Sequence, residues 1–181
     1  MSYILANDET ARNIRNRRQT QHRVPMRCAK WPTKRYSVPW RVGQLSCVRE
    51  AYNVYGVDSP VVVYRADAHS HAVGRWRPNI HMPRDLARTW VKLGRVWVEQ
   101  VQDISETDAA AEGVTVTVAH RMASRSFADL RPDLPFVGPA QQAFCDRWDS
   151  LYPGAWDRND WVWACEFECT EAPCAASPAS R

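Results

Sequence analysis

Apolar and polar residues alternate along several short stretches of the chain, which is the pattern of half-buried β-strands. The clearest stretch covers residues 88–101 and includes TWVKLGRVWVEQV. Gly94 interrupts it, so we expect a bulge or bend there. Weaker alternation or β-branched runs predict four more strands, at residues 3–6, 44–52, 61–65 and 160–169.

Short helices are predicted by capping residues and by apolar spacing near 3.6 residues. Asn7 or Asp8 can cap the first, which we expect to end at about Arg18. Ser105 caps the second in the manner of a capping box, and Gly113 stops it. A third is predicted over residues 139–152.

The order of these elements predicts an α+β fold, a small mixed β-barrel with short helices packed at its mouths. The strands do not alternate regularly with long helices, so a doubly wound sheet is not expected. Residues 1–169 form a single domain in this prediction. Residues 24–41, with three prolines, are predicted to be an irregular basic loop, and residues 170–181 a disordered tail.

Composition agrees with one globular domain, because 45% of the 181 residues are hydrophobic and 24% are charged. No apolar run approaches about 20 residues, so no membrane span is expected. The first residues do not form a secretory signal, and the six cysteines contain no C-x-x-C pair. We therefore predict a cytoplasmic protein with reduced thiols.

No cofactor or metal is expected from the sequence. His69, His71 and His81 with Asp67 are the only candidate metal cluster, and their spacing is not that of a known metal motif. We interpret these histidines as surface residues.

Charge is distributed unevenly along the chain. Residues 12–49 hold eleven Lys and Arg and no acid, whereas the remainder holds 13 basic and 20 acidic residues. Clustered cations release condensed counterions when they bind phosphates, so this block is a candidate nucleic-acid surface. The alternative is a solvated basic face that pairs with the acidic body of the same fold.

Six collinear segments, between residues 14 and 168, resemble the motifs of ASCH-domain proteins. They are IRNRRQTQHR (14–23), VGQLSCVREAY (42–52), WRPNIHMP (76–83), QDISETDAAAEG (102–113), WDSLY (148–152) and WVWACEFE (161–168). The form with IHMP is typical of phage and prophage proteins, so the resemblance implies a bacterial host.

The resemblance implies a PUA-like barrel with an RNA-associated cleft between the first helix and the barrel. Some ASCH relatives are acetylcytidine amidohydrolases, and others have been assigned a ribonuclease activity. The amidohydrolase site uses a Lys, a Thr and a strand Glu, and these positions fall on Gln19, His22 and Lys92. The preceding Thr of the motif is kept as Thr20, and its glycine is replaced by Arg17.

An alternative gap puts Arg18 and Gln21 at the Lys and Thr positions, so the nucleophile is absent in either alignment. Loss of one member of such a catalytic unit costs roughly 10³-fold or more. The leading hypothesis is therefore a non-catalytic module that binds RNA or another single strand. Its candidate contacts are Arg17, Arg18, Gln19, Thr20, Gln21, His22, Arg23, Arg49, Trp76, His81 and Lys92.

Two other functions remain open. One is an enzyme acting on modified nucleosides or RNA, with Thr20, His22 and Lys92 as rearranged catalytic candidates. The other is a phage-encoded protein that binds a host protein and inhibits a defence or nuclease complex. Three of the candidate contacts also have a structural interpretation. Trp76 can be a core residue, His81 a ring that is hydrogen-bonded to the backbone, and Arg49 the ion-pair partner of Glu50. The oligomeric state is left open.

Overall fold

The computed structural model describes residues 2–26, 39–56, 60–67, 74–130 and 137–172. In this part of the chain the fold is α+β, with seven strands and four α-helices. Five strands form one sheet in the order β1-β3-β6-β7-β2, and β4 and β5 form a separate antiparallel pair. The strands are β1 (Tyr3–Leu5), β2 (Gln21–Pro25), β3 (Leu45–Arg49), β4 (Tyr52–Tyr55), β5 (Val61–Tyr64), β6 (Trp90–Gln100) and β7 (Trp161–Thr170).

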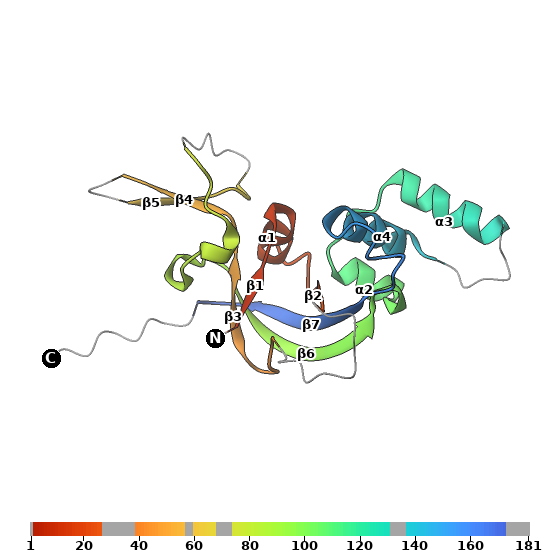
Figure 1. The fold of residues 1–181 in the computed structure, drawn as a ribbon, viewed down its shortest axis with the longest axis horizontal. Helices are drawn as coiled ribbons and strands as arrows, with labels where there is room; N and C mark the ends of the chain where they lie inside the picture. The colour runs from red at the N-terminus through yellow and green to blue at the C-terminus, as the bar shows by residue number, and fades with distance from the viewer. Residues whose placement is uncertain (1, 27–38, 57–59, 68–73, 131–136, 173–181) are drawn as a thin grey trace.

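The antiparallel pair of β6 and β7 is the long central part of the sheet, and both strands curve strongly (Figure 1). Their register shifts between Leu93 and Val96, which places the predicted irregularity at Gly94. A bulge increases the bend and twist of a strand, so it favours this curvature. A methyl group on Gly94 would meet only the Glu166 carbonyl oxygen, at 3.6 Å, so this sheet position is uncrowded.

Closure of the sheet into a barrel is not confirmed. β1 and β2 lie at opposite ends of the strand order. β1 pairs in parallel with β3, and β2 pairs antiparallel with β7. In the described residues they are edge strands that do not pair with each other.

The predicted loop at residues 24–41 is wrong at its start, because Val24 and Pro25 belong to β2 and pair with Trp163 and Val162. Pro25 is accommodated because it lies at the end of an edge strand, where a missing N–H is tolerated. Most of the remaining loop, residues 27–38, lies outside the described residues, as does most of the predicted tail.

The helices are α1 (Asp8–Arg15), α2 (Glu106–Ala111), α3 (Val118–Leu130) and α4 (Pro139–Leu151). Asn7 caps α1, accepting a hydrogen bond from the Thr10 backbone N–H, and Ser105 caps α2, as the sequence predicts. α1 ends earlier than expected, because Arg17 takes the left-handed conformation with φ of 57°. α3 was not predicted.

Two apolar clusters hold the helices against the sheet. The first packs Ile14 of α1 against Ile4, Leu93 and Phe167 of the strands. The second packs α4 against the other end of β7, with Val162 among its members. Figure 1 accordingly shows α1, α2 and α4 over the concave side of β6 and β7. The cavity described below borders the second cluster, which supplies Phe144 and Trp148 to its lining. Within the described ranges, none of the helices has the length and apolar character needed to span a membrane.

Candidate functional site

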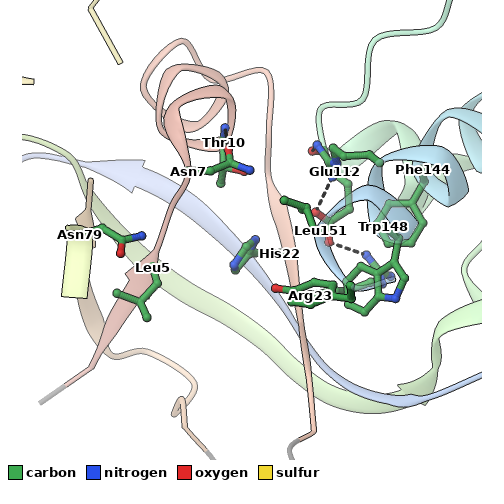
Figure 2. A pocket seen from close by; sticks show the side chains of 12 residues that line it. Leu5, Asn7, Thr10, His22, Arg23, Asn79, Glu112, Phe144, Trp148 and Leu151 are labelled. Carbon is green, nitrogen blue, oxygen red and sulfur yellow. Dashed lines mark hydrogen bonds and ion pairs between the residues drawn. The ribbon is translucent and has the colours of Figure 1, made fainter. Parts of the chain in front are cut away.

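A cavity of about 220 Å³ lies between α1 and α4, with β2 crossing between them. One wall comes from β1, α1 and the turn that contains Asn79, and the other comes from α4 and the residues around it (Figure 2). His22 of β2 lies between the two walls in this view. The lining residues are Leu5, Asn7, Thr10, His22, Arg23, Asn79, Glu112, Phe144, Arg147, Trp148, Leu151 and Tyr152.

The α4 wall is aromatic. Trp148 stacks on Phe144 with ring centroids 5.5 Å apart and contacts Tyr152 at 4.8 Å. Leu151 lies at the end of α4 and is 46% exposed, so it marks the side of the cavity nearest to solvent. Phe144 and Trp148 are almost completely buried, so half-buried Tyr152 is the ring of this wall that is most open to a planar ligand.

Arg23 carries the buried charge at the base of the cavity. Its side chain is fully buried and is held by Glu99, with Nε 2.6 Å from Oε1, and by Glu112, with Nη1 3.2 Å from Oε1. Nη1 also donates to Gln21 Oε1 at 3.0 Å. Its second terminal nitrogen, Nη2, has no hydrogen-bond partner in the described chain. A buried charged donor left unpaired is costly, which makes it a candidate ligand contact.

Glu112 is shared by several donors. Arg147 Nη2 lies 3.1 Å from its Oε2, and Gln19 Nε2 donates to the same oxygen at 3.2 Å. Burial raises the pKa of Glu112 to about 7, because the loss of solvation outweighs the opposing effect of Arg23 and Arg147. This carboxyl therefore titrates near neutral pH.

His22 is the polar group in the middle of the cavity. Its Nδ1 lies 3.5 Å from Gln19 Nε2, and its Nε2 has no partner among the described residues. Burial, together with the nearby charges of Arg147 and Arg23, lowers its pKa to about 3. The imidazole is thus neutral at physiological pH, and it offers one donor and one acceptor rather than a charge.

The predicted contacts from the first basic segment are divided between surface and interior. Arg17, Arg18 and Thr20 are exposed. Gln19 and Gln21 are buried and belong to the network of Arg23, in which Gln21 Nε2 donates to Asp108 Oδ1 at 2.7 Å. The structure thus brings His22 and Arg23 together in the cavity and leaves the other arginines outside it.

The remaining predicted contacts lie apart from this cavity. Trp76 is half-buried and lines a second cavity, whereas His81 and Lys92 are exposed and line neither of the two cavities. Lys92 is opposite Leu45 and Glu168 in the sheet, far along β6 from the cross-strand partners of His22. The position expected for a catalytic Glu is therefore not in the cavity.

The structural interpretation of Arg49 expects an ion pair with Glu50, and the structure does not contain that pair. Arg49 lies over the Tyr3 ring at 4.2 Å, and its Nη1 donates to the Ile80 carbonyl. Glu50 is instead bound by both ends of the Arg88 guanidinium, at 2.8 and 2.9 Å. Arg49 thus has a local packing role, and Glu50 a different partner.

Sequence reasoning missed Glu112 and Arg147. Glu112 comes directly after α2, where a charged residue is ordinary. Arg147 lies within α4, directly before Trp148 of its buried face. Their pairing joins residues 35 positions apart, so no local pattern indicates it.

A metal site finds no support in the described ranges, which contain no group of three or more His, Cys, Asp or Glu suited to an ion. His69 and His71 of the candidate cluster lie outside the described residues.

Comparison with protein-family models gives no match, and comparison with curated proteins gives none. Among solved structures, the chain is similar to the crystal structure of protein EF3133 from Enterococcus faecalis V583, family-model DUF984. The TM-score is 0.41 at 11% sequence identity, and the alignment covers 98% of this chain and 86% of that chain. At these values the likeness says nothing about activity.

Proposed function

We propose that this protein is an ASCH-type, PUA-like module that binds single-stranded nucleic acid, RNA in the first instance, and receives one unpaired base in the cavity between α1 and α4. The observation that carries the proposal is the pairing of an aromatic wall with two unpartnered polar atoms, His22 Nε2 and Arg23 Nη2. A base supplies both a flat face and an edge of donors and acceptors.

The charges in the cavity favour a base over a phosphate as its occupant. The two cations that line it, Arg23 and Arg147, are both bound to Glu112, and Arg23 is also bound to Glu99. Above pH 7, where Glu112 is ionised and His22 is neutral, little uncompensated positive charge remains. Such a site suits a neutral planar group that forms hydrogen bonds.

Exposed cations just after the C-terminal end of α1 would hold the backbone of the bound nucleic acid. Arg17 and Arg18 follow α1 directly and form no ion pair with a described residue. Phosphate contacts of this kind give affinity without sequence preference, whereas the base in the cavity gives selectivity for unpaired strands.

The test is a fluorescence-anisotropy titration of labelled single-stranded RNA, single-stranded DNA and duplex DNA at two salt concentrations. We expect RNA to bind most tightly, with a salt slope that reports roughly three to five phosphates. The double variant Arg17→Glu with Arg18→Glu should lose about tenfold or more in affinity. The matched control reverses Arg121 and Arg125, which are exposed on α3. Equal loss in both variants, or no binding by the unmodified protein at low salt, would overturn the proposal.

A second candidate function is hydrolysis of a modified nucleoside or of RNA, and the observation that favours it is Glu112. A buried carboxyl that titrates near pH 7 has the pKa expected of a general acid or base. Mass spectrometry of acetylcytidine and of RNA incubated with the protein tests it. Turnover that is lost in Glu112→Gln supports hydrolysis, and turnover no greater than that of a boiled control rejects it.

A further inference from the structure

A second cavity, also of about 220 Å³, adjoins the first. Asn7 and Asn79 line both cavities, so the two spaces meet at this pair of side chains. Figure 2 shows Asn7 and Asn79 on the side of the first cavity that lies away from Trp148. A ligand seated against the aromatic wall therefore faces the second cavity with its other end.

The shared wall is held in place by hydrogen bonds. Asn79 Nδ2 donates to the Ala6 carbonyl at 3.0 Å, and Asn7 Oδ1 accepts from the Thr10 backbone N–H at 2.8 Å. These bonds fix the two asparagines before any ligand binds, which lowers the cost of ordering the site.

The second cavity differs from the first in charge. Arg65 and Arg77 line it, and no carboxylate is among its lining residues, which also include Trp76, Pro78 and Ala51. Arg65 is bound by Asp8 at 2.7 Å, but Arg77 forms no ion pair with any residue in the described part of the chain. The second cavity therefore carries positive charge that the protein only partly neutralises.

The backbone of Arg77 is anchored even though its side chain is exposed. Its N–H donates to the Tyr52 carbonyl at 2.9 Å, and its own carbonyl accepts from the Tyr52 N–H at 3.2 Å. The guanidinium lies 5.8 Å from the centre of the Tyr52 ring. This arrangement presents a cation at a fixed place beside the second cavity.

We propose that the two cavities form one composite site for a nucleotide, with the base in the first and its phosphate in the second, between Arg65 and Arg77. The inference rests on the proposed function, because it assumes that the first cavity receives a base. A neutral aromatic cavity joined to a cationic one matches the two halves of a nucleotide, and guanidinium groups bind phosphate in preference to neutral ligands.

Isothermal titration calorimetry tests the composite site with four nucleosides, their 5′- and 3′-monophosphates, and inorganic phosphate. We expect the preferred nucleoside to bind measurably and one of its monophosphates to bind about tenfold tighter, as one charge-assisted contact provides. Added salt should reduce that difference. Arg77→Gln should abolish it and leave nucleoside affinity unchanged. The matched control is Arg75→Gln, because Arg75 is exposed and lines neither cavity.

The outcomes separate the two proposals. If nucleosides bind but their monophosphates bind no tighter, or if Arg77→Gln preserves the difference, the phosphate position is wrong and the base cavity stands. If inorganic phosphate binds as tightly as the nucleotides, the second cavity is a free-phosphate site and the composite site is overturned. If neither nucleosides, nucleotides nor single-stranded RNA bind, the proposed function fails together with this inference.

Discussion

Replacement of Glu112 by glutamine should change how the stability of the protein depends on pH. Glu112 is almost completely buried and lies between Arg23 and Arg147, and its pKa is raised from 4.5 to about 7. The folded protein therefore holds this proton more tightly than the unfolded chain does. The stabilising effect is complete below pH 4.5, declines as the pH rises and is lost above 7. Glutamine is uncharged throughout, so Glu112→Gln lacks the effect.

The size of the effect follows from the shift. Each unit of pKa difference corresponds to about 1.4 kcal/mol, so the whole shift of Glu112 is worth about 3 kcal/mol. Between pH 8, where the carboxylate is charged, and pH 5.5, where most of it is protonated, the expected change is about 2 kcal/mol. The free energy of unfolding of the unmodified protein should thus exceed that of Glu112→Gln by about 2 kcal/mol more at pH 5.5 than at pH 8.

The measurement is urea unfolding of both proteins at pH 5.5 and 8, followed by tryptophan fluorescence. Comparison of the two proteins at each pH is essential, because His22 has an opposite pH dependence that is common to both. A difference between the proteins that is independent of pH would refute the reasoning. A larger deficit of Glu112→Gln at pH 8 than at pH 5.5 would do so as well, because it would mean that the charged carboxylate, and not the protonated one, is the form that stabilises the fold.

Three further predictions concern other parts of the fold. His22 has its pKa lowered to about 3, so the unmodified protein should lose about 1.4 kcal/mol per pH unit relative to His22→Gln as the pH falls below 6.5; acid titration of both proteins measures this. Arg88→Gln leaves the buried Glu50 carboxylate without its partner and should cost about 3 kcal/mol in urea unfolding, and a loss below about 1 kcal/mol would show that the pair contributes little. Ser105→Ala removes the cap of α2 and should lower stability by about 1 kcal/mol, whereas Ser105→Thr, whose hydroxyl can accept from the Asp108 N–H and donate to the Asp108 carboxylate, should retain it.

Local patterns predicted much of the fold because they act within a few residues. The cap of α2 at Ser105 and the bulge at Gly94 depend on neighbours in sequence, and both were confirmed. β2 was not predicted, because Val24 and Pro25 lie in a proline-containing stretch and acquire strand structure by pairing with β7. Tertiary pairing overrode local propensity there.

The candidate site was predictable only in part. The resemblance of residues 14–23 to a known motif drew attention to His22, which the structure places in the cavity. The resemblance of residues 102–113 to another motif of the same family drew attention to Lys92, which lies elsewhere on the sheet. Glu112 and Arg147 were missed because their importance arises from burial beside Arg23, and burial of charged residues leaves no periodic signal in the sequence.

The most direct test of the central claim is to block the cavity and measure binding of single-stranded RNA by fluorescence anisotropy. Leu151→Trp places an indole at a lining position that is 46% exposed, so it fills the space without disturbing the core. Val118→Trp, at a position of α3 that is 70% exposed, is the matched control. A base in the cavity predicts a loss of tenfold or more, by analogy with about 1–3 kcal/mol per stacked base, for Leu151→Trp alone. Unchanged affinity of a folded Leu151→Trp protein would contradict the account.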